Sequence, residues 1–242
     1  MKRTQLFTLA GLMIASSGYA SATTISFQGL DAALSTSVWL DFTYMAGDTM
    51  LNGNTANRQR TVTESIGVGA LDISVDGSLQ LQDAFCVDPF RYISNGNYTV
   101  NLAGPSAVTN GSRAAWMVHD ILPQISASTN ANLARNMAAA LQLAIWDVVT
   151  DNGDGFGRGR IQASSNTSKP TDAAILSLAN SFISQSVGQS SANAYIISNV
   201  NLQFNTQRLI IDRPGSAVPE PSTWALALSG LAFAAFRRVK RF

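Results

Sequence analysis

The segment that decides the fold reads Ala139-Ala140-Leu141-Gln142-Leu143-Ala144-Ile145-Trp146-Asp147-Val148-Val149. Its apolar residues recur at helical spacing, which predicts an amphipathic helix with one face towards a core. That face consists of Met137, Leu141, Ile145 and Val148. Gln142 lies beside it, and a buried amide without hydrogen bonds costs about 1–3 kcal/mol. We therefore expect Gln142 to bond inside the fold, to reach solvent or a backbone group, or to be used chemically.

The chain's one cysteine lies in a second short segment, Phe85-Cys86-Val87-Asp88. One cysteine excludes an intrachain disulfide. The first residues of the chain, described below, predict export into an oxidising compartment. We therefore expect the Cys86 thiol to be buried, paired between chains, or chemically capped.

The two segments together resemble the bacterial thioester domains of cell-surface adhesins, over about residues 70–190. In that family an aromatic-Cys-aliphatic motif precedes apolar-Gln-x-Ala-apolar-Trp. The resemblance implies that the Cys86 sulfur displaces ammonia from the Gln142 carboxamide and forms an internal thioester. It also implies covalent binding of an amine- or hydroxyl-bearing surface or matrix target. Each molecule would bind once, so the protein is not expected to be an enzyme.

A thioester must be protected from water, and bulky aromatic side chains can supply an apolar shelter. The candidates near the two motifs are Phe85, Phe90 and Trp146. His119 is the only histidine, and it either lies on a helix surface or helps to activate Cys86. With Cys86 and Asp120 it also permits a different interpretation, a cysteine hydrolase.

The segment Asp151-Asn152-Gly153-Asp154-Gly155 has the composition of a calcium loop. The spacing does not fit, because glycines stand where the third and fifth positions need side-chain oxygens. A turn at the end of a helix is the better interpretation. The sequence therefore predicts no metal site here, and no motif in it calls for a cofactor.

Charge is sparse and unevenly placed along the 242 residues. Charged residues make up 13%, and six of the 16 Lys and Arg lie in the terminal segments. Between Thr23 and Ala217 this leaves 10 basic residues against 14 acidic ones. A mildly acidic folded part gives no case for nucleic-acid binding. Residues 23–212 have about the length of one domain.

The N-terminal residues have the pattern of a secretory signal peptide. Lys2 and Arg3 precede an apolar run from Leu6 to Ala15, and Ala20-Ser21-Ala22 supplies small residues for cleavage. The run is too short to span a bilayer comfortably. We expect a signal peptide at residues 1–22, cleaved after Ala22 or alternatively after Ala20.

The C-terminal residues combine a proline-rich linker at 213–223, an apolar run and a basic end. The run from Trp224 to Phe236 spans about 20 Å as a helix, less than the roughly 30 Å hydrocarbon core. A basic stop follows it and favours a cytoplasmic end. This stop consists of Arg237, Arg238, Lys240 and Arg241.

With Pro219-Glu220-Pro221 in the linker, these three features resemble the PEP-CTERM sorting signal of Gram-negative bacteria. The resemblance implies an inner-membrane precursor whose tail, residues 224–242, is removed by an exosortase. The processed protein would then be attached to the cell surface or released. Proteins sorted in this way often accompany exopolysaccharide and biofilm production.

Strand patterns and helix patterns are segregated along the chain. Thr24–Phe27, Val38–Met45, Leu71–Val75 and Tyr98–Leu102 favour strands, and Asp76-Gly77 favours a hairpin turn into Leu79–Leu81 and on to Cys86. Gly47–Arg60 is expected to be an exposed loop. Helices are predicted at Arg113–Leu122, capped by Ser112 and with Pro123 near the stop, at Asn130–Thr150, and through Ser186 from a start formed by Thr171 with Asp172. Strands follow at Tyr195–Phe204 and Arg208–Ile211.

This segregation predicts an α+β domain, a β-sandwich or barrel-like sheet with a packed helical subdomain. The leading functional hypothesis is an exported protein that binds covalently through Cys86 and Gln142. One alternative is a noncovalent biofilm or matrix protein with a free buried Cys86. The second alternative is the cysteine hydrolase.

Overall fold

The computed structural model describes residues 23–50, 53–200 and 206–213. The predicted signal peptide, the PEP motif and the predicted apolar tail lie outside the described residues. Within the described part of the chain, no helix is long and apolar enough to cross a membrane.

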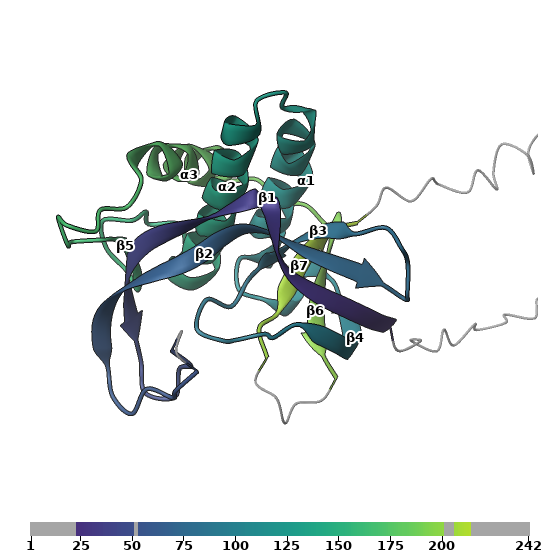
Figure 1. Ribbon diagram of the computed structural model, residues 1–242, viewed down its shortest axis with the longest axis horizontal. Helices are drawn as coiled ribbons and strands as arrows, with labels where there is room; N and C mark the ends of the chain where they lie inside the picture. Colours follow the sequence, from purple (N-terminus) through teal and green to yellow (C-terminus); the bar gives the residue numbers. More distant parts are fainter. Residues whose placement is uncertain (1–22, 51–52, 201–205, 214–242) are drawn as a thin grey trace, which may run out of the picture.

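In the described residues, seven strands and three α-helices make up the fold (Figure 1). The strands are β1 (Thr23–Tyr44), β2 (Arg60–Val75), β3 (Gln82–Cys86), β4 (Gly96–Ala103), β5 (Ile161–Ala163), β6 (Ala194–Asn199) and β7 (Leu209–Asp212). The helices are α1 (Gly111–Ala127), α2 (Ala131–Asp151) and α3 (Ala173–Gln185), with a short 3-10 turn η1 (Pro105–Ala107) before α1.

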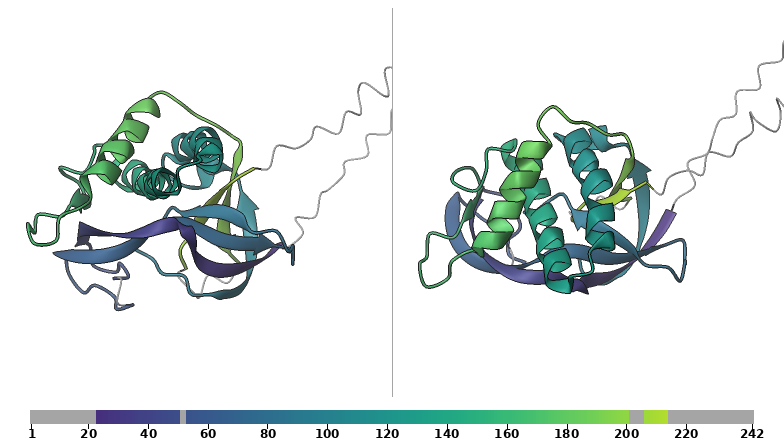
Figure 2. Two further views of the ribbon diagram at one scale, coloured as in Figure 1. Left: turned by 45° about the horizontal axis from the view of Figure 1, so that its top comes forward. Right: turned by 90° about the horizontal axis from the view of Figure 1, so that it is seen from above.

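The sheet closes on itself. Its strand order is β2-β3-β7-β6-β4-β1-β5, every pairing between named strands is antiparallel, and β1 also pairs with β2. The first six strands in this order, from β2 to β1, therefore form a barrel-like ring. The last strand, β5, pairs with the C-terminal half of β1. Figure 2 shows the three helices together on one side of this sheet. The predicted α+β class with a barrel-like sheet and packed helices is confirmed.

The β1–β2 hairpin is long and bent. Its first strand, β1, runs unbroken through two segments that the sequence predicted as separate strands. Its register with β2 shifts at Phe27/Gly29 and again at Leu30/Ser35. Gly69 of β2 lies at the second shift with φ +135°, and a Cβ there would meet the Leu34 carbonyl oxygen at 2.1 Å. Only glycine fits this approach of the two backbones.

The helix caps bear out most of the predicted helix starts. Asn130 and Asp172 accept hydrogen bonds from the first backbone N–H groups of α2 and α3. The prediction for α1 was wrong at both ends. The helix begins at Gly111 and continues through Pro123 to Ala127. Proline costs about 3 kcal/mol inside a helix, but the last turn of α1 buries Ile125 in the core, which favours continuation.

One smaller prediction was wrong, and one short strand was missed. Leu79–Leu81 is not a strand, because β3 begins at Gln82 and Leu79 is fully exposed. The predicted turn before it is confirmed, since Asp76 and Gly77 both have positive φ. The short strand β5 was not predicted, and it exists because its backbone pairs with Leu40–Phe42 of β1.

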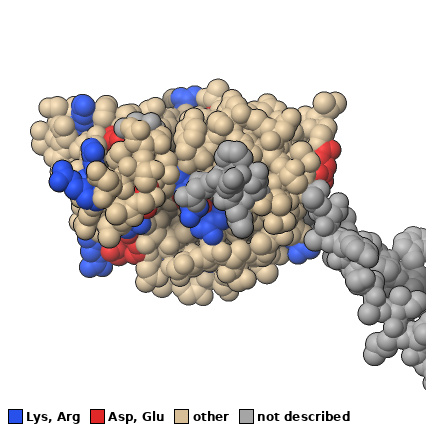
Figure 3. All heavy atoms as spheres, turned by 90° about the horizontal axis from the view of Figure 1, so that it is seen from below, with Lys and Arg blue, Asp and Glu red and all other residues tan. Residues whose placement is uncertain are grey.

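The face of the molecule in Figure 3 carries its charged side chains as small separate groups on a largely uncharged surface. This pattern agrees with a charged content of 13%. Among the described residues some opposite charges are paired, for example Arg160 with Asp48.

Candidate functional site

Cys86 pairs with strand β7 on one side, but on its other side it has no pairing with strand β2. The β2–β3 ladder ends at the pair Leu71 and Ala84, whereas the β3–β7 ladder continues to Cys86 and Leu209. Val87 donates its N–H to the Arg208 carbonyl on the β7 side. Because backbone groups alternate along a strand, the N–H and C=O of Cys86 face away from β7.

Gln142 fills this place with its side-chain amide. Cys86 donates its backbone N–H to Gln142 Oε1 at 2.8 Å, and Gln142 Nε2 donates to the Cys86 carbonyl oxygen at 2.8 Å. A carboxamide held by both backbone groups of one residue lies within a few ångströms of the side chain of that residue. The structure therefore brings the two predicted thioester residues together, 56 positions apart in sequence.

Helix α2 holds Gln142 rigidly in this position. Gln142 is 2% exposed, and apolar α2 residues from Ala138 to Val148 are buried around it. The side chain of Asn130 caps the start of the helix. A glutamine fixed on a buried helix has few other rotamers to occupy, so its amide is preorganised against Cys86.

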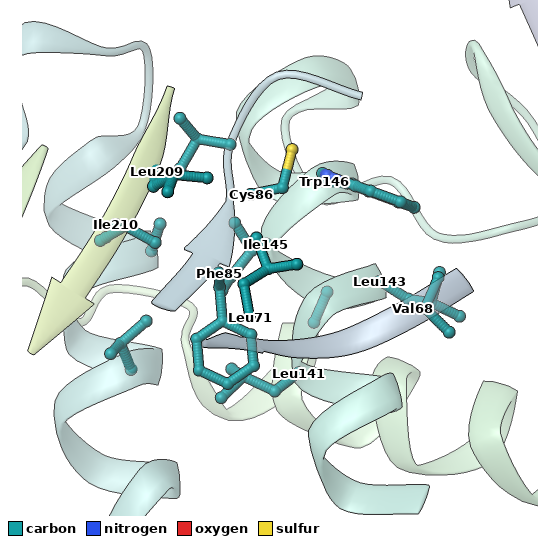
Figure 4. Packing of buried hydrophobic residues seen from close by; sticks show 14 of the residues in the cluster. Val68, Leu71, Phe85, Cys86, Leu141, Leu143, Ile145, Trp146, Leu209 and Ile210 are labelled. Carbon is teal, nitrogen blue, oxygen red and sulfur yellow. The ribbon is translucent and has the colours of Figure 1, made fainter. Parts of the chain in front are cut away.

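The Cys86 thiol is buried and, among the described residues, free of any disulfide. Burial raises the pKa of this thiol well above its ordinary value, and the nearby Trp146 indole N–H acts in the opposite direction. Figure 4 shows the sulfur of Cys86 beside the ring nitrogen of Trp146. That buried nitrogen has no hydrogen-bond partner among the described residues. Burial therefore favours the neutral thiol, and the Trp146 N–H beside it is the donor that would hydrogen-bond a thiolate.

The other predicted shelter residues occupy different surroundings. Successive side chains of a strand point to opposite faces, and in Figure 4 the Phe85 ring points away from the Cys86 sulfur. Phe90 packs edge-on against Phe42 and Tyr44, with the Arg160 guanidinium 3.8 Å from its ring centre. Both phenylalanines are buried. Their role as a thioester shelter stays a prediction.

A pocket of about 260 Å³ reaches the pair from the surface. Cys86, Gln142 and Trp146 form part of its wall, and apolar side chains supply much of the rest. These apolar residues are Phe27, Leu30, Ile66, Leu71, Pro89 and Ile93. Arg91 and the exposed Tyr92 also line it. A small group on a partner thus has a route to an otherwise buried site.

An ion pair fixes the chain directly after Cys86. Arg208 donates from Nε and from a terminal guanidinium nitrogen to the two carboxylate oxygens of Asp88, both at 2.6 Å. The backbone N–H of Arg208 also donates to Asp88, at 3.0 Å. Sequence patterns gave no sign of this pair, because its members are 120 positions apart.

His119 is placed elsewhere by helix α1. Its Nδ1 lies 3.1 Å from Asp212 Oδ1, its side chain is 47% exposed, and it is not among the residues that line the Cys86 pocket. Asp120 is exposed and contacts Gln124 of the same helix. The structure thus brings together Cys86, Gln142 and Trp146 without His119. An activating role for this histidine stays a prediction.

Comparison with known proteins identifies the C-terminal residues. Residues 217–241 match the PEP-CTERM protein-sorting motif. This range contains the predicted Pro219, Glu220 and Pro221 and the predicted basic stop. The motif implies an exported, membrane-anchored precursor that is processed by an exosortase and sorted to the cell surface.

Comparison with curated proteins and solved structures adds one similarity. No curated protein matches the sequence. Among solved structures, the N-terminal domain of the Streptococcus pyogenes pilus tip adhesin Cpa is similar, with a TM-score of 0.38 and 13% sequence identity. The alignment covers 72% of this chain and 92% of that domain.

Proposed function

We propose that the protein is an exported cell-surface or extracellular-matrix protein that binds its partner covalently through a thioester between Cys86 and Gln142. The observation that carries the proposal is the pair of 2.8 Å hydrogen bonds between the Gln142 amide and the Cys86 backbone. They hold an acyl carbon beside the chain's one thiol. The sorting motif supplies the route to the surface.

The bond-forming step balances without a cofactor. The Cys86 sulfur attacks the Gln142 side-chain carbonyl carbon, the C–N bond breaks, and ammonia leaves with the thiol proton. Negative charge develops on Gln142 Oε1 during the attack, and the Cys86 N–H already donates to this oxygen. A donor placed in advance on a developing oxyanion stabilises the transition state.

Trp146 offers a second donor on the same helix. A buried N–H without a partner costs about 1–3 kcal/mol, and the Trp146 indole is such a group among the described residues. It lies one helical turn after Gln142, beside the Cys86 sulfur (Figure 4). We infer that it donates to the acyl oxygen in the transition state or in the finished thioester.

Binding then consumes the thioester. An amine or hydroxyl of the partner enters the pocket and attacks the acyl carbon, the C–S bond breaks, and Cys86 is restored as a thiol. The product is an amide or an ester at Gln142. Since the amide does not revert, each protein molecule binds once.

A specific observation also favours the noncovalent alternative. The Gln142 amide satisfies both backbone groups of Cys86 as a strand would, so a purely structural role is complete without any reaction. In that case the mature protein keeps a free buried thiol.

Intact mass of the protein purified after export separates the two functions. A thioester lowers the mass by one ammonia relative to the sequence, and incubation with methylamine then adds the mass of one methylamine. Cys86→Ala must show neither change. A wild-type mass that equals the sequence mass, with no methylamine adduct, would exclude the thioester and support the noncovalent function.

A further inference from the structure

Three carboxylates meet at the end of α2, directly after Trp146 in the sequence. Asp147, Asp151 and Asp154 each offer one oxygen, and these oxygens lie within 4.8 Å of one another. Asp147 and Asp151 share a helix face because they are four residues apart. Asn152 then ends the helix in the left-handed conformation, and Gly153 follows with φ +78°, which turns Asp154 back towards the other two.

Asp147 is the unusual member of this group. It is 0% exposed, and its Oδ1 has no hydrogen-bond partner among the described residues. Its other oxygen accepts one long bond, 3.3 Å, from the Gly155 N–H. Buried carboxylates are normally paired or bound to metal, because an unpaired buried charge is strongly unfavourable. The Asp147 carboxylate is therefore a buried group that a cation could stabilise.

The neighbouring Arg113 does not form an ion pair with Asp147. Arg113 lies near Asp147 but donates instead to Ser186 Oγ and to the carbonyls of Asn152 and Ile183. Burial, together with the charges of Asp154 and Asp151, raises the pKa of Asp147 to about 6. The positive charge of Arg113 therefore only partly offsets the repulsion.

The other two carboxylates each keep one oxygen for a ligand. Asp151 uses Oδ2 to accept the backbone N–H groups of Arg160 and Ile161. Asp154 uses Oδ2 in an ion pair with Arg158, a side chain that is 76% exposed and easily displaced. These bonds fix the two carboxylates through one oxygen of each.

We propose that Asp147, Asp151 and Asp154 bind one calcium ion. Calcium binds oxygen ligands at about 2.3–2.6 Å, so two oxygens on opposite sides of one ion lie roughly 5 Å apart. The 4.8 Å limit within the group fits this span. The group contains no histidine or cysteine, which disfavours zinc and copper. Backbone carbonyls and water would complete the coordination.

This site was not predicted from the sequence, which indicated no metal. The spacing test considered only Asp151-Asn152-Gly153-Asp154-Gly155, whereas the buried ligand, Asp147, comes from one helical turn earlier. The ion would fasten the end of α2 to the segment that leads to β5.

Calorimetric titration of the exported protein, stripped of metals with a chelator, tests the site. Calcium chloride should bind with a stoichiometry of one and raise the thermal unfolding temperature. Asp154→Asn should weaken binding on the order of tenfold or more, because it removes one of three charged ligands. This variant changes an exposed residue and should fold normally.

Asp120→Asn is the matched control, since Asp120 is an exposed aspartate on α1 outside the group. It should bind calcium as the wild type does. Absence of saturable heat and of any thermal shift up to about 10 mM calcium, beyond the range of extracellular calcium modules, would overturn the proposal. Equal binding by Asp154→Asn and wild type would overturn it as well.

Discussion

The side-chain amide of Gln142 takes the place of a β-strand beside Cys86, with one hydrogen bond to its N–H and one to its C=O. In a continued β2–β3 ladder the partner of Cys86 would be Gly69, two residues before Leu71. Gly69 does not pair with Cys86, and one register shift of the β1–β2 hairpin falls just after its pair with Ser35. Gln142 occupies the place that this end of the β2–β3 ladder leaves, and its acyl group therefore lies next to the thiol.

The structural part of this relationship is measurable where no thioester can form. In a Cys86→Ala background, Gln142→Leu leaves the backbone N–H and C=O of residue 86 buried and unpaired. We expect the free energy of unfolding to fall by about 2–5 kcal/mol, from two lost partners. Urea denaturation checks this. Gln124→Leu, at an exposed position of α1, should change stability by less than about 0.5 kcal/mol. Equal effects of the two substitutions would contradict a structural role for the hydrogen bonds between Gln142 and the backbone of residue 86.

The pKa of Cys86 predicts a pH dependence for protein that lacks the thioester. Burial raises this pKa well above 9.0, so the folded state holds the neutral thiol while the unfolded chain ionises near 9. The stabilising contribution is therefore present below about pH 9 and is lost as pH rises towards the raised value. In Gln142→Leu, unfolding free energy should fall between pH 8 and 10 more steeply than in Gln142→Leu with Cys86→Ala. Parallel profiles would show that the thiol is not buried as described.

Loss of the Asp88–Arg208 ion pair should loosen the chain after Cys86. Arg208→Ala leaves the mostly buried Asp88 without its two-point partner, and we expect a stability loss of about 1–3 kcal/mol together with slower thioester formation. Arg158→Ala removes an exposed pair with Asp154 and should cost at most about 1 kcal/mol. Denaturation and the time course of ammonia loss measure the two effects. Equal stability and equal rates of ammonia loss in the two variants would show that the Asp88–Arg208 ion pair does not hold the chain after Cys86.

Trp146→Phe tests the unused indole donor. The substitution keeps an aromatic ring beside Cys86 but removes the N–H, so thioester formation should slow by about tenfold or more. The fraction of molecules that have lost ammonia, followed by intact mass after synthesis, gives the rate. Trp116→Phe on α1 is the control, because Trp116 does not line the pocket. An unchanged rate in Trp146→Phe would show that this donor does not act on the acyl oxygen.

Local patterns predicted the elements that depend on local chemistry. The starts of α2 and α3 near Asn130 and Asp172, the turn at Asp76-Gly77 and the helix that carries Gln142 follow from neighbouring residues. The end of α1 does not, because burial of Ile125 against distant elements outweighs the cost of Pro123. The strand β5 likewise exists only through its pairing with β1.

For the candidate site too, some features were predictable from local sequence and others required the folded structure. Its two central residues were recognisable from short motifs around Cys86 and Gln142. Their hydrogen bonds were not, since they depend on where the β2–β3 ladder ends. The Asp88–Arg208 pair and the convergence of Asp147 with Asp154 require the folded chain, because spacing alone does not show which carboxylate is buried.

Peptide mapping by tandem mass spectrometry is the most direct test of the proposed bond. Digestion of the exported protein with pepsin at low pH, where thioesters survive, should give one joined peptide pair that contains Cys86 and Gln142 and lacks one ammonia. After methylamine treatment the pair should separate into a free Cys86 thiol and a Gln142 methylamide. Recovery of Cys86 entirely as a free thiol from untreated protein, with an unmodified Gln142 amide, would contradict the account.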